Sequence, residues 1–520
     1  MQKQEGEADA KLEVIGAAEE YARIQQQNFV KGVLQVFTDG PLDKDVIITL
    51  CGDAGTGKSH TLNMLEEQLK ILGWYHLLLI TTTTHAASAI LCRDTPTIYS
   101  ATCLNNQKLL HCAPVELDEE LRKSNSAFSD IRDTWDANVE ARLTQSRRHN
   151  HFCKTFSNRC VQCMKMYARY HGECRAKVFG KSIVVIDEMG MLDRKSLEKV
   201  IMASRFFNPS CGMVFILCGS ISQLTMPALE GIWQSSLLEE LWLGGCYLSY
   251  NFRLNQDYEL ADSLACMQHN VVTQSCKELL DACVIEDSRY TLCPEFKPEA
   301  VRIFNANRLR DDYNDKCLAY HVQQNPDLVI YDLSPTMYKA EEQNHSVANR
   351  AWNAFYARFN HVDRHKPLKL CVNTMVTIYR QPGIPYGQGT VIAISPLGKH
   401  YRLTIRRLGS NDKTQIDVST FTNPKLPEIY HYPISVSHAI NTFAAQGSTM
   451  KHSVIYCPPT KKYFTSKIKA SAYVACTRVT KRKNLIISHN SFANTEGYAP
   501  FFTPQLLAFK EQYEMNYDYQ

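Results

Sequence analysis

The feature that most restricts the fold of this 520-residue chain is a glycine-rich loop with the spacing G-x-x-x-x-G-K-S. The loop consists of Gly52, Asp53, Ala54, Gly55, Thr56, Gly57, Lys58 and Ser59. An apolar run, residues 46–50, precedes it, and a helical pattern, residues 61–69, follows. A strand, a glycine loop and a helix in this order place backbone N–H groups and the positive end of a helix around a phosphate. The spacing therefore predicts a nucleoside triphosphate site on an α/β fold.

Each position of the loop has an expected task. Lys58 would reach the β- and γ-phosphates, and Ser59 would hold Mg²⁺. A second apolar run, residues 182–186, ends in Asp187 and Glu188. On the same sheet, Asp187 would hold Mg²⁺ and Glu188 would polarise the attacking water. We expect the whole loop and the following His60 to surround the nucleotide.

A third apolar run ends in another polar group. Residues 213–218 lead into Gly219, Ser220 and, three positions later, Gln223. A glutamine at this strand end can touch both the γ-phosphate and the attacking water. We therefore expect Gln223 to couple the nucleotide to movement.

Two arginines far along the chain are candidates for charge stabilisation. Arg253 ends a predicted strand, and Arg478 ends an apolar helical segment. We expect both in a second α/β unit, from which they would face the phosphate loop across a cleft and stabilise the transferring phosphoryl group. A plain surface position is the alternative for either one.

The whole-chain composition is that of a globular intracellular protein. Apolar residues make up 44% and charged residues 21%, and the net charge is +4. The 19 cysteines, in a chain with a polar start, indicate reduced thiols in the cytoplasm, the nucleus or a viral replication site, not secretion. The longest apolar runs fall short of 18 residues, so no membrane span is expected.

The order of patterns predicts several domains. Residues 1–45 read as an N-terminal helical segment. Residues 46–228 form a first α/β domain, interrupted by an insertion at 101–181. Residues 229–367 and 431–520 form a second α/β domain, and residues 368–430 between them read as a small β-barrel.

Hydroxyl-rich segments allow two interpretations. Thr83, Thr84 and His85 follow a strand, and Thr97 and Ser100 form a similar group. Such hydroxyls suit phosphate contacts on a polynucleotide, but they also suit helix caps. The glutamines at 25–27 are equally open: one of them can read the adenine edge, or all three can be a polar helix face.

The second half of the insertion is basic and aromatic, which suits single-stranded nucleic acid, although a solvated charged face is the alternative. It also contains two close pairs of metal-binding residues. The pairs are Cys160 with Cys163 and His171 with Cys174. They predict a zinc site, with coincidence as the competing account in a chain so rich in cysteine.

Together these segments resemble superfamily 1 helicases of the 5′→3′ group, the Pif1, RecD2 and Dda-like enzymes. The resemblance runs in order from Gly52 to about residue 487. It includes the phosphate loop, Asp187-Glu188, Gly219 to Gln223, Phe252-Arg253, Gln446 to Thr449 and Tyr473 to Arg478.

The resemblance implies two RecA-like P-loop domains with ATP and Mg²⁺ between them, a 1B insertion at 101–181 and an SH3-like 2B barrel at 368–430. It places Gln27 and Gly447 beside the nucleotide. It implies single-stranded DNA and duplex junctions as partners. The residues that would contact the strand are Thr83, Thr84, His85, Thr97, Ser100, Asn307, His438, Thr442 and Gln446.

This chain departs from the family pattern in two places. The third motif usually has aspartate where Ser220 stands, and the fifth usually has histidine, lysine and serine where residues 443–445 are Phe-Ala-Ala. Gly219-Ser220 resembles the helicase subunit of herpesvirus-type helicase–primase complexes, which implies a primase or other replication proteins as partners. The fifth-motif departure affects side-chain contacts with the strand and leaves the ATPase intact.

The sequence thus predicts an ATP-dependent DNA helicase of replication, recombination or repair. An RNA-directed motor of the same fold stays open, because the motifs do not distinguish the sugars. A nucleic-acid-binding subunit that no longer hydrolyses ATP is the third hypothesis. The presence of Lys58, Asp187, Glu188 and Arg478 speaks against it.

Overall fold

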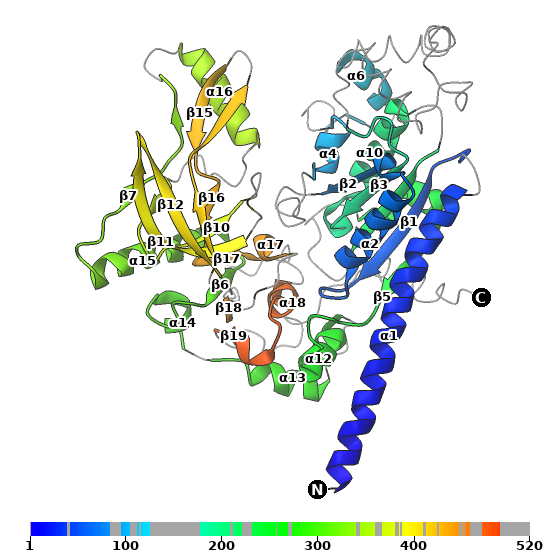
Figure 1. Cartoon of the computed structure of the whole chain (residues 1–520), viewed down its shortest axis with the longest axis horizontal. Coiled ribbons are helices and arrows are strands. Elements are labelled where there is room, and N and C mark those ends of the chain that lie inside the picture. The colour runs from blue at the N-terminus through cyan, green and yellow to red at the C-terminus, as the bar shows by residue number, and fades with distance from the viewer. Residues whose placement is uncertain are drawn as a thin grey trace. The chain divides into compact units, whose positions relative to one another are not determined.

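The fold was analysed in a computed structural model of the chain, which contains two compact units (Figure 1). The first comprises Met1–Asn255 with Phe501–Gln520, and the second comprises Gln256–Pro500. The structure describes residues 2–38, 42–83, 95–104, 112–113, 116–124, 177–208, 212–220, 231–255, 257–268, 273–285, 287–339, 344–358, 367–379, 384, 387–408, 412–423, 426–446, 450, 453–457 and 471–488.

The first unit is built on a five-stranded sheet in the order β2-β3-β4-β1-β5, and all its pairs are parallel. The strands are β1 (Val46–Gly52), β2 (Leu78–Thr82), β3 (Ile183–Asp187), β4 (Val214–Gly219) and β5 (Trp242–Leu248). The apolar runs become strands because both faces of the sheet are covered, so β1, β3 and β4 are buried along their whole length. Parallel pairing brings the polar strand ends to one edge.

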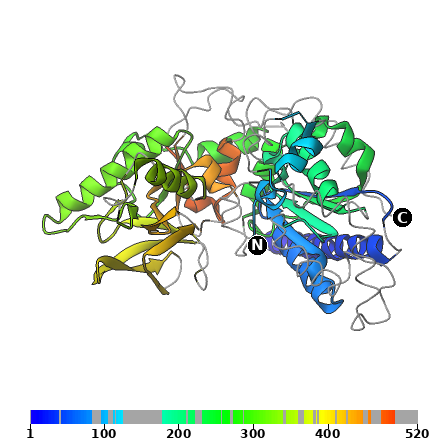
Figure 2. The ribbon, with the colours of Figure 1, turned by 90° about the horizontal axis from the view of Figure 1, so that it is seen from above.

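Helices cover both faces of this sheet, as Figure 2 shows with the blue helices on one side and the cyan-to-green helices on the other. On one face, α1 (Gln2–Thr38) and α2 (Lys58–Ile71) pack against β1 through Phe29, Val33 and Leu65. The other face carries α4 (Ile98–Ala101), α6 (Leu117–Ser124), α10 (Arg194–Phe207) and α11 (Ser236–Leu241). β1, the phosphate loop and α2 follow one another as strand, loop and helix, and α1 occupies most of the N-terminal segment.

The boundary between the units differs from the prediction. The sequence pattern placed it after residue 228, but β5 pairs in parallel with β1, and the first unit extends to Asn255. The apolar pattern of residues 242–248 is that of a strand in either unit, so only pairing decides its place. Arg253 therefore belongs to the first unit, and its predicted position in the second was wrong.

The second unit contains a four-stranded parallel sheet in the order β17-β6-β18-β19. Its strands are β6 (Val301–Phe304), β17 (Ala439–Asn441), β18 (Val454–Cys457) and β19 (Leu485–Ile487). The long helix α15 (Asn307–Gln324) packs on it through Tyr313 and Cys317. The other helices are α12 (Tyr258–Gln268), α13 (Gln274–Asp281), α14 (Arg289–Leu292), α17 (Thr442–Ala445) and α18 (Ser471–Cys476).

Antiparallel strands interrupt this second unit. A five-stranded sheet has the order β13-β12-β11-β10-β16, a three-stranded sheet has the order β14-β15-β8, and β7 pairs with β9. The strands are β7 (Tyr331–Asp332), β8 (Thr336–Met337), β9 (Lys369–Leu370), β10 (Met375–Ile378), β11 (Gly387–Leu397), β12 (His400–Arg407), β13 (Lys413–Ile416), β14 (Ser419–Asn423), β15 (Leu426–His431) and β16 (Ile434–Val436). Helix α16 (His345–Arg358) packs against β15.

The paired strands of this region extend beyond the predicted barrel at 368–430 on both sides. Its pairing begins with β7 and ends with β16, which continues directly towards β17. The pairs between described strands form separate sheets and do not close into a barrel. Among the described helices, none has the length and apolar character that a bilayer crossing requires.

Candidate nucleotide-binding site

The phosphate loop follows β1 and is tightly enclosed by its neighbours. Gly55 and Gly57 adopt φ angles of 91° and 89°, which residues with a Cβ rarely adopt. A Cβ on Gly55 would lie 2.5 Å from Asn251 Oδ1 and 2.6 Å from Arg253 Cβ. Glycine is therefore required here both by backbone conformation and by space, as a loop that wraps closely around phosphates demands.

Lys58 is held by the loop itself. Its Nζ donates hydrogen bonds to the carbonyl oxygens of Gly52 at 2.8 Å and of Asp53 at 2.7 Å. Ser59 and His60, in the first turn of α2, are exposed. The two carbonyls belong to the loop that would enclose the phosphates of a nucleotide. Phosphate oxygens can therefore replace these carbonyls as acceptors for Lys58.

The end of β3 supplies a buried carboxylate. Burial, and next the negative charge of Glu188, raise the pKa of Asp187 to about 6. The Glu188 backbone N–H donates to Asp187 Oδ1 at 2.9 Å, and this bond and the Lys58 ammonium lower the pKa. The Cys218 thiol also bonds to this carboxylate, and burial raises the pKa of the thiol well above its usual value. A divalent cation would stabilise a buried carboxylate of this kind, so the residues present fit Mg²⁺.

Glu188 has an unusual backbone. Its φ is 59°, a left-handed conformation that costs a residue with a Cβ about 1–2 kcal/mol. The carbonyl oxygen of Glu188 accepts a hydrogen bond from the Thr83 hydroxyl at 3.1 Å. Strain of this kind tends to persist at functional sites, where the surroundings over-determine it.

The segment after β5 closes the loop from the side. Asn251 Nδ2 donates to the carbonyl of Ala54 at 3.1 Å, and Asn251 Oδ1 accepts from the backbone N–H groups of Arg253 and Leu254. Arg253 therefore lies beside the phosphate loop within the first unit. Sequence reasoning missed Asn251, although it stands two residues before the arginine that was selected.

A glutamine of α1 also reaches the loop, but not the expected one. Gln26 is buried, and its Nε2 lies 3.5 Å from the carbonyl oxygen of Thr56, whereas Gln27 is exposed. The helical repeat decides this difference, because adjacent residues lie about 100° apart around a helix. Gln26, not Gln27, therefore reaches the loop, and contact of Gln27 with a nucleotide stays a prediction.

Arg478 lies in the second unit, where it is fully buried. Its Nε donates to the carbonyl of Val474 at 2.8 Å, Nη1 to the carbonyl of Ala445 at 3.3 Å and Nη2 to the Thr477 hydroxyl at 2.6 Å. These bonds join the ends of α17 and α18. Its role towards a nucleotide stays a prediction.

Several side chains expected to contact a nucleic acid are instead used inside their own unit. Thr83 bonds to Glu188, and the Thr97 oxygen caps α4 by accepting from the Ser100 N–H at 3.2 Å. The first belongs to the strand end and the second is the helix cap that the sequence left open as an alternative. Both threonines are buried, and their contacts with nucleic acid stay predictions.

The same holds for two residues of the second unit. The His438 Nε2 accepts from the Met375 N–H at 3.0 Å, and burial lowers the pKa of this ring to about 3. The Thr442 hydroxyl donates to Asn305 Oδ1 at 2.7 Å. His438, Thr442 and Gln446 are buried, and their contacts with nucleic acid stay predictions.

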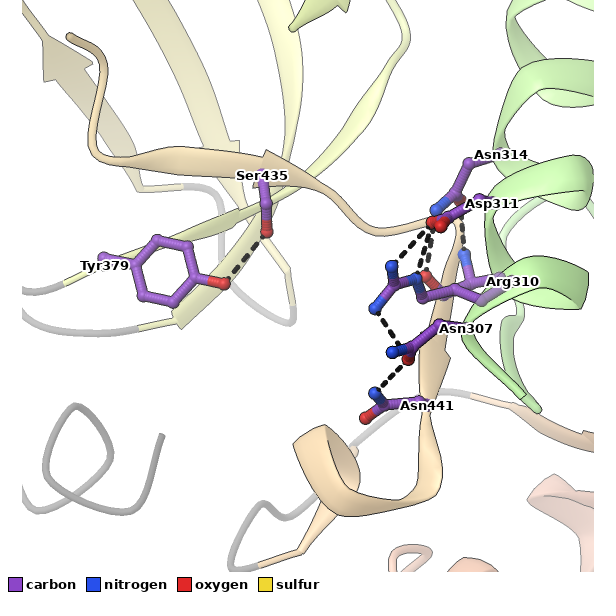
Figure 3. Close-up of polar contacts among 8 residues, drawn as sticks. Asn307, Arg310, Asp311, Asn314, Tyr379, Ser435 and Asn441 are labelled. Atoms are coloured by element: carbon purple, nitrogen blue, oxygen red, sulfur yellow. Dashed lines mark hydrogen bonds and ion pairs between the residues drawn. The ribbon is translucent and has the colours of Figure 1, made fainter. Parts of the chain in front are cut away.

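Asn307, by contrast, is exposed at the start of α15 (Figure 3). Its Oδ1 accepts from Asn441 Nδ2 at 2.6 Å and from Arg310 Nη1 at 3.2 Å, and Arg310 also pairs with Asp311. Nearby, the Tyr379 and Ser435 hydroxyls bond to each other at 3.1 Å. Asn307 therefore keeps the surface position that a nucleic-acid contact requires.

Other predicted residues lie outside the described part of the chain. They are Thr84, His85, Gln223, Gly447 and the four zinc candidates Cys160, Cys163, His171 and Cys174. Within the described part, no group of three or more His, Cys, Asp or Glu residues is arranged to hold a metal ion.

Comparison with known proteins agrees with this geometry. The AAA domain family matches residues 42–225, a span that contains the phosphate loop and β1 to β4. No curated protein matches the chain in sequence.

Solved structures of Pif1 helicases share the fold of the whole chain. The Pif1 helicase from Candida albicans has a TM-score of 0.63 and 16% identity, and the match covers 94% of this chain and 98% of that one. The Pif1 helicase from Bacteroides in complex with ADP-AlF3 and single-stranded DNA has a TM-score of 0.57 and 14% identity, covering 94% and 97%. At these identities the comparison establishes the fold: the chain has the Pif1 helicase fold, with a P-loop AAA domain in its first half.

Proposed function

We propose that the protein is an ATP-dependent DNA helicase that moves along single-stranded DNA. One observation carries this proposal: a chain with the Pif1 helicase fold over 94% of its length holds Lys58 on its phosphate loop and a buried Asp187 beside Glu188 on β3. The related Pif1 structures include complexes with ADP-AlF3 and single-stranded DNA. The presence of Lys58, Asp187 and Glu188 speaks against a subunit that no longer hydrolyses ATP.

The residues divide the work of hydrolysis. Lys58 exchanges its two carbonyl partners for phosphate oxygens, which orients the β- and γ-phosphates. Ser59 and Asp187 would hold Mg²⁺, which would supply positive charge beside the phosphates. Glu188 orients the attacking water and accepts its proton. Arg253, beside the loop, stabilises negative charge on the transferring phosphoryl group.

The decisive experiment is Lys58→Ala in the full chain. We expect it to abolish ATP turnover stimulated by single-stranded DNA, because nothing else in the loop can replace the ammonium. The matched control is Lys70→Ala in the same helix α2, where the lysine pairs with Glu66 and Glu67 and lies 5.3 Å from the centre of the Tyr75 ring. Near-normal turnover by Lys58→Ala would refute the assignment.

We propose 5′→3′ movement and a DNA substrate in replication, recombination or repair. Strand displacement on 5′-tailed and 3′-tailed duplexes tests the polarity, and comparison of poly-dT with poly-U as activators tests the sugar preference. Faster displacement on 3′-tailed duplexes would overturn the polarity. Stronger activation by poly-U would favour an RNA-directed motor.

Two finer proposals come from sequence patterns. We propose that Cys160, Cys163, His171 and Cys174 bind Zn²⁺. Metal analysis of the purified protein, compared with a Cys160→Ser variant, tests this site.

The Gly219-Ser220 pair is similar to that of herpesvirus-type helicase subunits. We therefore propose a primase or another replication protein as partner. Co-purification from the native host tests this association.

A further inference from the structure

The side chain of Asp53 joins the ends of three strands. The Ser220 hydroxyl, just after β4, donates to Asp53 Oδ1 at 3.2 Å, and the Tyr247 hydroxyl, in β5, donates to Asp53 Oδ2 at 3.3 Å. The register places these donors on both sides of β1, since Cys51 pairs with Gly219 on one neighbour and with Tyr247 on the other. A single carboxylate thus connects β4, β1 and β5 at the edge where the phosphate loop begins.

The main chain of the same residue holds the loop lysine. The Asp53 carbonyl oxygen accepts from Lys58 Nζ at 2.7 Å and from the Thr56 hydroxyl at 3.0 Å. The preceding carbonyl, of Gly52, accepts from Lys58 Nζ at 2.8 Å. Rotation of either peptide would move the lysine, and a side chain anchored at both carboxylate oxygens opposes such rotation.

We propose that Asp53, Ser220 and Tyr247 form a clamp that positions Lys58 for the triphosphate. In this Asp53 clamp, Ser220 and Tyr247 are positioning residues: they act through Asp53 and the loop, without touching the reacting atoms. The proposal rests on the proposed function, because it assigns the clamp to ATP binding at the same loop. It goes beyond that function by giving Ser220 a task in nucleotide affinity.

The clamp also gives a physical account of the departure in the third motif. Helicases that the chain resembles usually have aspartate at the position of Ser220. Here the carboxylate stands on the neighbouring strand end, at Asp53, and serine supplies the donor. In this chain one hydrogen bond, from Ser220 to Asp53, therefore joins the end of β4 to the end of β1.

The sharpest test exchanges the two residues. Asp53→Ser alone removes the acceptor, and Ser220→Asp alone places two carboxylates about one hydrogen-bond length apart, where like charges repel. We expect the Michaelis constant for ATP to rise about tenfold in the first variant and about 100-fold in the second. The combined variant restores one donor and one acceptor, and we expect its constant to return to within about threefold of the wild-type value.

Two conservative variants report on the donors separately. Ser220→Ala and Tyr247→Phe each remove one hydroxyl, and we expect each to raise the Michaelis constant for ATP about three- to tenfold. The maximal rate should change less than twofold, since neither residue touches the reacting atoms. Tyr250→Phe is the matched control, because its hydroxyl bonds to Glu19 of α1 at 3.5 Å.

The measurements are steady-state ATP turnover with saturating oligo-dT and titration with a fluorescent ATP analogue, on the full chain. Thermal unfolding of every variant identifies a loss of fold. A combined variant no better than Ser220→Asp alone would overturn the proposal. Wild-type nucleotide affinity in both Ser220→Ala and Tyr247→Phe would overturn it as well.

These outcomes are separable from a failure of the proposed function. If the wild-type protein binds nucleotide but neither hydrolyses ATP nor displaces strands, the proposed function fails while nucleotide affinity still tests the clamp. If Lys58→Ala abolishes turnover and the clamp variants match the wild type, the proposed function stands and the clamp is wrong. Absence of nucleotide binding in the wild type would overturn both.

Discussion

The two parallel sheets of this protein differ most at the strand end that leads into a helix. In the first unit, β1 leads into α2 through a loop with three glycines, Gly52, Gly55 and Gly57. In the second, β6 leads into α15 through Asn305 and Ala306 alone. The backbone plan is similar, but only the first connection is a glycine-rich loop long enough to wrap around a phosphate.

In the second unit, a buried network of side chains occupies the strand ends instead. Asn305 Nδ2 donates to Ser471 Oγ at 3.0 Å and lies 3.4 Å from the Tyr456 hydroxyl, while Thr442 donates to Asn305 Oδ1. The network connects β6 and β18 with α17 and α18. Both sheets thus bring their strand ends together at one edge. The residues at that edge decide whether it can bind a nucleotide or holds helices in place.

The largest expected effect concerns Glu188. If the first sheet alone carries the hydrolytic chemistry, Glu188→Gln should lower the maximal ATPase rate by about 10²–10⁴-fold, because the water loses its proton acceptor. Nucleotide affinity should change little. Steady-state kinetics with oligo-dT measures both, with Glu239→Gln at an exposed position of α11 as control. A rate within tenfold of the wild-type value would contradict the assignment of the hydrolytic chemistry to the first sheet.

The next effect separates two fully buried arginines of the second unit. Arg302 donates to the carbonyls of Lys297 and Ala300 and lies 5.0 Å from the centre of the Tyr313 ring, so its contacts are structural. We expect Arg302→Leu to lower the free energy of unfolding by about 2–4 kcal/mol, because several buried carbonyls lose their donor. Denaturant titration measures this change, and the folded fraction should turn over ATP at the wild-type rate.

For Arg478→Ala we expect retained nucleotide binding and a turnover lower by about 10³-fold, if this arginine stabilises phosphoryl charge. Its bonds to Val474 and Ala445 mean that the variant will also lose stability. Turnover must therefore be normalised to the folded fraction, with Arg302→Leu as the matched reference. Equal behaviour of the two variants would assign Arg478 a structural task only.

A smaller effect is expected at the centre of the second network. Asn305→Ala should lower the free energy of unfolding by about 1–3 kcal/mol, since Ser471 and Thr442 lose a buried partner. Hydrogen exchange should show faster opening of α17 and α18, with nucleotide affinity unchanged. Asn349→Ala, at an exposed position of α16, is the control. A drop in nucleotide affinity without loss of stability would contradict this division of tasks.

The smallest effect concerns the exposed start of α15. We expect Asn307→Ala to weaken single-stranded DNA binding about threefold, the value of one neutral contact among several. Asn325→Ala, at the opposite end of the same helix, should have no effect. Fluorescence anisotropy of labelled oligo-dT without nucleotide measures both variants. Equal affinities would remove Asn307 from the proposed DNA path.

The sequence was most informative where function depends on neighbouring residues. The loop from Gly52 to Ser59 and the Asp187-Glu188 pair were predictable because each is a contiguous pattern on one strand end. Long-range relations were less predictable. The pattern of residues 247–253 predicted a strand, but the strand is β5 (Trp242–Leu248), and no local pattern indicated its sheet. Gln26 and Gln27 could not be told apart without the rotation of α1.

By itself, then, the sequence determined the phosphate loop, the carboxylates of β3 and the α/β class, since glycine conformation, apolar runs and helix starts act over a few residues. Only the tertiary structure decided that Ser220 and Tyr247 meet Asp53, across 167 and 194 residues of chain. It also decided that Arg253 belongs beside the loop. The physical reason is that strand order, which no local pattern encodes, chooses which distant side chains share the edge of a sheet.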